Sequence, residues 1–157
     1  MAVASVAVPP LAKERNRRAS GPERVWSGFM ATGALAPLAV GATLSPDPAG
    51  HGTHTQLGLP PCGWVVAYGK PCPTCGMTTA FTHAAHGRLD LALVAQPAGT
   101  VLSVLAAVLF WIGLHTAVTG SRVAPKMVAG IRGRHAIGLV LLVLAGWGYM
   151  MLTFRPG

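Results

Sequence analysis

Three long stretches that lack Asp, Glu, Lys and Arg constrain the fold of this chain more than any other feature of its sequence. They cover residues 25–44, 98–118 and 136–154. A helix of about 20 apolar residues crosses the ~30 Å hydrocarbon core of a bilayer, because each residue adds about 1.5 Å to its length. We therefore predict an all-α membrane protein with about three transmembrane helices, one in each stretch.

The scarcity of charge supports a lipid environment for these helices. Only 10% of the 157 residues are charged, whereas an average soluble domain contains about 25%. The formal net charge is +8, but nine of the twelve Lys and Arg residues lie in two short segments beside the uncharged stretches. A nucleic-acid-binding protein gathers its basic residues on one folded soluble face. The expected partner is thus the lipid bilayer, and nucleic acid is not expected.

The two basic segments also predict the orientation of the protein in the membrane. The first is residues 1–24, which we expect to be a cytoplasmic tail, so that residues 25–157 form a single membrane domain. The second is the loop at residues 122–134. Three spans place both segments on the same side, and basic segments beside spans face the cytoplasm. The prediction is a multi-pass protein with a cytoplasmic N-terminus and an outward-facing connection between its first two spans.

That outward connection is expected to contain a further short helix. Residues 45–71 are rich in Pro and Gly, which is typical of an irregular loop, and Trp64 and Tyr68 suit the membrane interface. Residues 73–86 contain only one helix breaker, Gly76, besides the initial proline, and Gly87 marks the following turn. We predict an interfacial or re-entrant helix over about residues 73–86, which carries the CPTCG segment.

A CxxC pair is the sharpest local motif. Cys72 and Cys75 flank Pro73 and Thr74, and Cys62 lies ten residues before the pair. Cysteines at this spacing can form a disulfide, share a metal ion, or cycle between thiol and disulfide. Pro73 suits the first residue of a helix, so Cys72 would cap that helix and its thiolate would be favoured. In the redox alternative Cys72 attacks and Cys75 resolves.

Histidines could complete a metal site. On a helix that runs through Cys75, the side chains of His83 and His86 recur at spacings of three and four and share a face. The three cysteines and one histidine would form a four-ligand site for zinc or another transition metal. The tentative metal ligands are Cys62, Cys72, Cys75, His83 and His86, with His51 and His54 as further histidines. No catalytic residue is predicted, and these motifs do not define an enzyme.

Three parts of the sequence form a recognisable pattern: CPTCGMT, which begins at Cys72, HGRLDLAL, which begins at His86, and Gln96-Pro97. This pattern resembles the signature of a bacterial membrane family catalogued as domain of unknown function 2752. The resemblance covers roughly residues 60–155. Thr79 stands where that family usually has Arg, and Gln96 where it usually has Asn. The resemblance implies a helical protein of the bacterial inner membrane and names no activity. The positions that fall on the pattern are Cys72, Pro73, Cys75, Gly76, Thr78, Gly87, Ala92 and Pro97.

These observations lead to one expected function and two alternatives. We expect an integral membrane protein whose outward-facing CxxC turn, together with Cys62, is structural or binds a metal. The first alternative is a membrane participant in thiol–disulfide exchange. The second is a small subunit that packs against another membrane protein through its Gly-rich helices.

Overall fold

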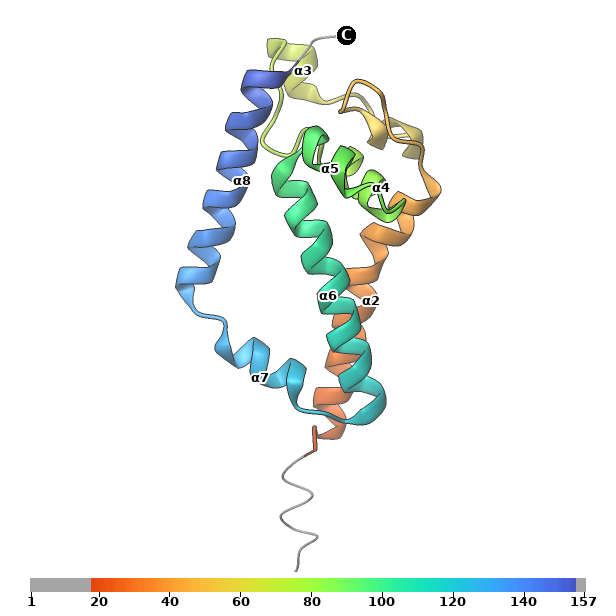
Figure 1. The fold of residues 1–157 in the computed structure, drawn as a ribbon, viewed down its shortest axis with the longest axis vertical. Coiled ribbons are helices and arrows are strands. Elements are labelled where there is room, and N and C mark those ends of the chain that lie inside the picture. The colour runs from red at the N-terminus through yellow and green to blue at the C-terminus, as the bar shows by residue number, and fades with distance from the viewer. Residues whose placement is uncertain (1–17, 155–157) are drawn as a thin grey trace, which may run out of the picture.

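The computed structural model describes residues 18–154, and the regular secondary structure of these residues is all helical, without a strand. Figure 1 shows long helices with several short ones gathered at one end. The expected all-α fold is confirmed. Most of the tail predicted at residues 1–24 lies outside the described residues. The elements are α2 (Gly21–Thr43), η1 (Thr53–Leu57), α3 (Gly63–Tyr68), α4 (Met77–Ala85), α5 (Leu89–Ala95), α6 (Pro97–Thr119), α7 (Val123–Gly130) and α8 (Gly133–Thr153).

Helices α2, α6 and α8 are each long and apolar enough to cross a membrane. Their ends depart by a few residues from the uncharged stretches because capping groups set them. Helix α2 begins at Gly21, since the Ser20 hydroxyl accepts from the Glu23 N–H and the Glu23 carboxylate accepts from the Ser20 N–H. Helix α6 begins at Pro97, whose missing N–H costs nothing at a helix start.

Helices α2 and α6 form the main packed pair of the bundle. A Cβ atom on Gly113 would lie 2.7 Å from the Ser27 carbonyl oxygen, so a glycine is needed where the two backbones meet. Arg24 fastens the same pair at one end, because its guanidinium donates to the carbonyl oxygens of Ala117 and Val118 at distances of 2.9–3.1 Å. These carbonyls lie in the last turn of α6, where helix acceptors lack partners.

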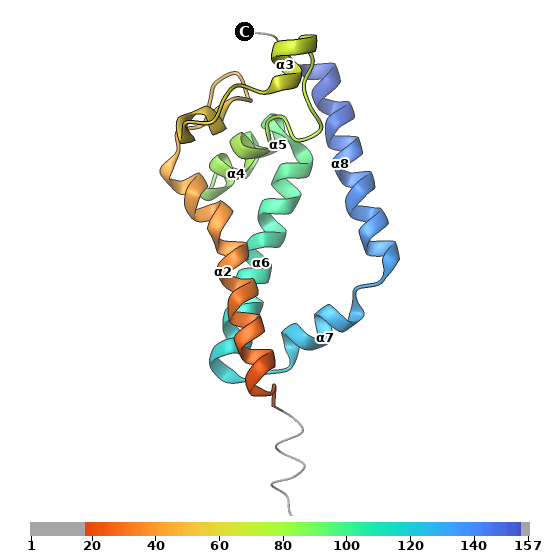
Figure 2. The ribbon, with the colours of Figure 1, turned by 180° about the vertical axis from the view of Figure 1, so that it is seen from behind.

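Helix α8 packs against α6 at one end and diverges from it toward α7, as both faces of the molecule show (Figures 1 and 2). A Cβ atom on Gly146 would lie 2.7 Å from the Ala98 Cβ atom, so the two helices touch there. Residues 131–141 are all exposed. Helix α8 is therefore attached to α6 mainly through its second half, and it does not pack against α2.

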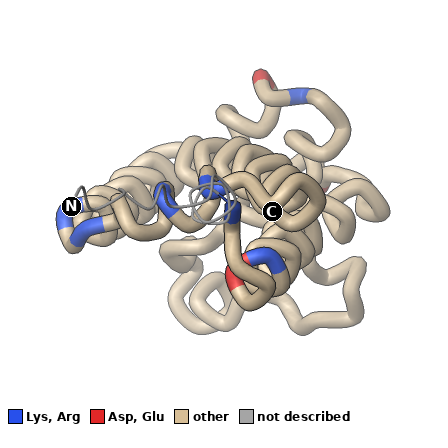
Figure 3. The backbone as a smooth tube through the Cα atoms, turned by 90° about the horizontal axis from the view of Figure 1, so that it is seen from below, with Lys and Arg blue, Asp and Glu red and all other residues tan. Residues whose placement is uncertain are grey.

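The end of the bundle that carries α7 also carries a group of basic residues. Figure 3 views this end directly and shows Lys and Arg spread across it. Arg122 forms an ion pair with Glu23 at 3.5 Å, which joins the loop after α6 to the first turn of α2. We call this the basic end and the opposite end, with η1, α3, α4 and α5, the cysteine end.

At the cysteine end, α4 packs against α2, α5 and α6 around the buried side chains of Ala80, Ala92 and Ala95. The predicted helix over residues 73–86 is present, but the prediction of its start was wrong. Residues 73–76 form a turn that ends in the left-handed conformation of Gly76 (φ +79°), and α4 begins only at Met77. Cys72 consequently precedes a turn and does not cap the helix.

Candidate functional site

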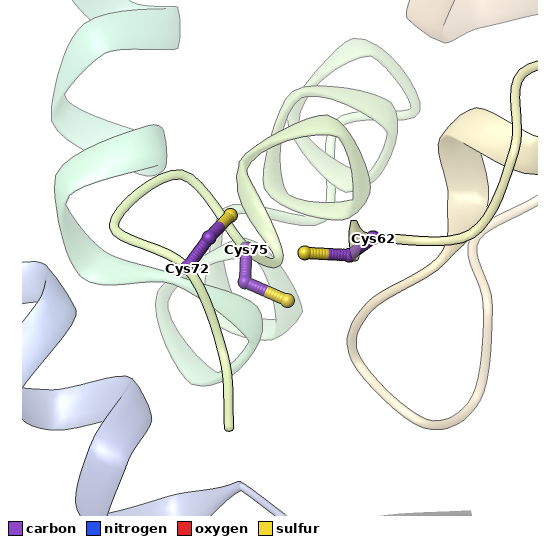
Figure 4. A group of neighbouring side chains, drawn as sticks. All are labelled: Cys62, Cys72 and Cys75. Carbon is purple, nitrogen blue, oxygen red and sulfur yellow. The ribbon is translucent and has the colours of Figure 1, made fainter. Parts of the chain in front are cut away.

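The structure brings all three cysteines together. The Sγ atoms of Cys62, Cys72 and Cys75 lie within 4.8 Å of one another, and Figure 4 shows the three side chains converging on one point. Cys62 comes from the loop before α3, whereas Cys72 and Cys75 come from the turn before α4. All three are free thiols. Two segments of the chain thus meet to form one three-sulfur cluster, which we call the thiol cluster.

The turn that carries Cys72 and Cys75 is held by local hydrogen bonds. The Cys75 N–H donates to the Cys72 carbonyl at 3.0 Å, and the Cys72 sulfur lies 3.4 Å from the Thr74 hydroxyl. Gly76 closes the turn against two other segments. A Cβ atom on Gly76 would lie 2.9 Å from the Gly50 carbonyl oxygen and 3.0 Å from the Ala95 carbonyl oxygen. Only glycine suits both this close approach and the positive φ angle.

The three thiols differ in burial and in proton affinity. Cys75 is only 6% exposed, and burial together with the nearby Cys72 and Cys62 sulfurs raises the pKa of its thiol to about 12. Cys62 is half-buried. Burial alone would raise its pKa, but the N–H groups of Val65 and Trp64 and the Cys72 side chain outweigh that effect and lower it. Cys62 is the N-cap residue of α3, where amide groups favour a thiolate.

Neither His83, on α4, nor His86, at its C-terminal cap, joins the thiol cluster. Among the described residues, the group that could hold a metal ion consists of the three cysteines alone. The expected shared face assumed a helix through Cys75, but Cys75 lies in the turn before α4. His86 instead approaches the Thr82 carbonyl oxygen through its Nδ1 atom at 2.8 Å. Metal binding by the cysteines stays a prediction.

His83 faces a separate cavity of about 460 Å³ between the loop after α2, α5 and the end of α8. His51, Asp47 and Tyr149 also line this cavity. Burial, with the positive charge of Arg88 nearby, lowers the pKa of His83. His54, the remaining histidine considered, lies in η1.

The other motif positions have structural places in the cysteine end. Pro97 starts α6, Gly87 provides the left-handed residue between α4 and α5 (φ +75°), and the Thr78 carbonyl accepts from the Thr82 hydroxyl at 2.9 Å. Pro73 is the first residue of the turn between Cys72 and Cys75.

The two positions that depart from the expected family pattern are both fully buried. The Thr79 hydroxyl lies 2.8 Å from the hydroxyl of Thr53, so this position joins α4 to η1 through a small polar pair that an arginine would not fit. Gln96 caps α6, because its side-chain oxygen accepts from the Gly99 N–H. Both substitutions therefore have partners inside the fold.

The thiol cluster and the short helices around it coincide with the part of the chain that is similar to a known family. Residues 62–111 match the family model described as Protein of unknown function (DUF2752). The match bears out the resemblance to DUF2752 expected from the sequence over residues 62–111, although it ends in α6 and does not reach the expected residue 155. It spans all three cysteines. Neither a curated protein nor a solved structure matches the chain.

Proposed function

We propose that Cys62, Cys72 and Cys75 bind one metal ion through three thiolates. The observation that carries this proposal is the convergence of three sulfurs within 4.8 Å. A Zn–S bond is about 2.3 Å long, so two sulfurs on a tetrahedral zinc ion lie about 3.8 Å apart. The spacing of the thiol cluster therefore needs only a shift of about 1 Å or less per sulfur to accommodate such an ion.

The chemistry of the donors indicates the class of metal. Thiolates favour zinc, Cu(I) and iron–sulfur centres over hard ions such as Mg²⁺ or Ca²⁺. A cation would also favour the thiolate of Cys75, whose pKa is now raised by burial and by the nearby Cys72 and Cys62 sulfurs. No His, Asp or Glu among residues 18–154 completes the group. The ion would have three protein ligands and one position open to water or another ligand.

A second candidate function is thiol–disulfide exchange by Cys72 and Cys75. The turn that holds both residues close favours it, because its hydrogen bond joins their backbones at 3.0 Å. A buried thiol such as Cys75 also suits a resolving role. However, Cys62 would then have no part in the reaction, although it is the thiol whose pKa is lowered. A metal site uses all three sulfurs.

We also propose that the cysteine end faces outward from a bacterial inner membrane and that the N-terminus is cytoplasmic. The supporting observation is the gathering of basic residues at the basic end, opposite the thiol cluster (Figure 3). They belong to the first turns of α2 and α8 and to α7 with its preceding residue: Arg24, Arg122, Lys126, Arg132 and Arg134. The proposed metal site then lies beside the outer membrane–water interface, where ions from the outer compartment can reach it.

The metal proposal is tested on the full chain in detergent. Elemental analysis uses protein purified under reducing conditions, and thiol counting uses protein purified without reductant. We expect about one zinc or other soft ion per chain, and its loss in each of the variants C62S, C72S and C75S. His86→Ala is the matched control, because this histidine follows the end of α4, outside the thiol cluster, and the variant should retain the ion. A metal content that is insensitive to C62S would contradict a three-sulfur site. Absence of metal with one free thiol per chain, and a disulfide retained in C62S, would instead support the exchange function.

A further inference from the structure

One side chain from the far end of the sequence contacts both segments that form the thiol cluster. The indole N–H of Trp147, on α8, donates to the Pro71 carbonyl oxygen at 3.0 Å. Pro71 immediately precedes Cys72. The ring of Trp147 also packs edge-on against the ring of Trp64, with centroids 6.0 Å apart, and Trp64 follows Cys62 by two residues. Trp147 thus bridges the two cysteine-bearing segments from outside the cluster.

The segment before the CxxC turn has few other ways to be held. Pro71 and Pro73 lack an N–H group, so Cys72 offers the only backbone donor in this tripeptide. The Pro71 residue is buried, and a buried carbonyl without a donor is unfavourable. The indole N–H of Trp147 supplies that donor. The position of Cys72 therefore depends on a side chain of α8 as well as on the local hydrogen bonds of the turn.

A second contact from α8 reaches the other side of the turn. The methyl group of Met150 would lie 3.3 Å from a Cβ atom on Gly76, which is the residue after Cys75. Met150 is buried, and it follows Trp147 by three residues, so both project toward the cysteine end from one helix face. The last turns of α8 thus contact the chain on both sides of the CxxC motif.

We propose that Trp147 is a positioning residue of the thiol cluster: by holding Pro71 and Trp64 against α8, it sets the distance between Cys72 and Cys62. This inference rests on the proposed metal function for its consequence, because the distance between these sulfurs decides whether three thiolates reach one ion. Hydrogen-bonding partners behind metal ligands typically change metal affinity by about 10- to 100-fold when removed. Loss of the Trp147 hydrogen bond should weaken binding by about tenfold.

The test uses two variants of the full chain in detergent. Trp147→Phe keeps an aromatic ring against Trp64 but removes the N–H group. Tyr149→Phe is the matched control, because it removes a hydrogen bond of 2.9 Å from the same end of α8 to the Val94 carbonyl of α5, away from the cysteine-bearing segments. Cobalt(II) serves as the probe ion, since its thiolate charge-transfer absorption reports ligation by sulfur. We expect wild type and Y149F to bind cobalt equally and W147F to bind about tenfold more weakly, with the absorption band retained at saturation.

A measurement without metal separates this inference from the proposed function. In a Cys75→Ser background, a short crosslinker with two thiol-reactive groups joins Cys62 to Cys72 in proportion to their proximity. We expect W147F to lower the crosslinking yield and Y149F to leave it unchanged. If wild type binds no cobalt but W147F still lowers crosslinking, the metal proposal fails and the positioning role stands. Should W147F not fold, Trp64→Leu removes the ring contact and should lower crosslinking as well. Unchanged crosslinking in a folded W147F or W64L protein, or equal losses in W147F and Y149F, would overturn the positioning role.

Discussion

Replacement of Gly76 by alanine tests whether the turn beside Cys75 is fixed by close packing. Gly76 has a φ angle of +79°, and an added Cβ atom would lie 2.9 Å from the Gly50 carbonyl oxygen and 3.0 Å from that of Ala95. Gly87 is a matched control, because its φ angle is +75° and nothing lies within 4 Å of an added Cβ atom. The two substitutions therefore share the backbone strain and differ only in the clash.

The expected magnitudes follow from these two contributions. A left-handed conformation costs an alanine roughly 1–2 kcal/mol, which applies to both variants. Overpacking against surroundings that cannot move freely adds about 1–3 kcal/mol, and at Gly76 those surroundings are backbone carbonyls. We expect a loss of about 1–2 kcal/mol for Gly87→Ala and about 2–5 kcal/mol for Gly76→Ala.

Thermal unfolding of both variants in the same detergent measures the difference. For a chain of this size, 1 kcal/mol corresponds to about 2–4 °C in the unfolding midpoint, so G76A should unfold several degrees below G87A. Metal content provides a second measurement, because only G76A displaces the residue next to Cys75. Equal midpoints, or a G87A variant less stable than G76A, would refute the packing argument.

Three further predictions address reactivity, topology and helix packing. A thiol reagent at neutral pH should label Cys62 much faster than Cys75, because the pKa of Cys62 is lowered while Cys75 is buried with a pKa of about 12; equal rates in the folded protein would contradict this. A reporter fused after Gly157 should behave as non-cytoplasmic, and cytoplasmic activity would mean that the three helices do not all span. Gly113→Ala should destabilise the bundle through its 2.7 Å approach to α2, whereas Gly33→Ala, with nothing within 4 Å, should be neutral or stabilising by up to about 1 kcal/mol; effects of the same sign would count against the packing of α2 on α6.

The spans could be predicted from the sequence because crossing a bilayer is a local property of about 20 consecutive residues. The ends of the helices were harder to predict from the sequence, since they depend on caps such as the Ser20–Glu23 pair. The start of α4 shows the limit. Pro73 is a good first residue for a helix, but Gly76 takes a left-handed conformation that places the helix start beyond both cysteines of the motif.

The candidate site was predictable in its sulfur atoms and not in its surroundings. The spacing of Cys72 and Cys75 is a local signal, and Cys62 was included as the remaining thiol. His83 and His86 were expected to join the cysteines, but they lie outside the cluster. That expectation assumed that both histidines and Cys75 share one face of a helix, whereas Cys75 lies in the turn before the helix. Trp147 carried no signal, since its partner Pro71 lies 76 residues away and only the folded bundle brings them together.

The separation between Pro71 and Trp147 in the sequence has a consequence for the biosynthesis of the protein. A chain is synthesised from its N-terminus, so all three cysteines have left the ribosome before the helix that contacts them exists. The pair α2 and α6, fastened by Arg24, can already be complete at that stage. An ion or an oxidant that reaches the cysteines before α8 is made encounters a thiol cluster that lacks its contacts with α8. If Trp147 positions the thiol cluster as proposed, a nascent chain arrested before α8 should hold its thiols in a looser arrangement than the full protein.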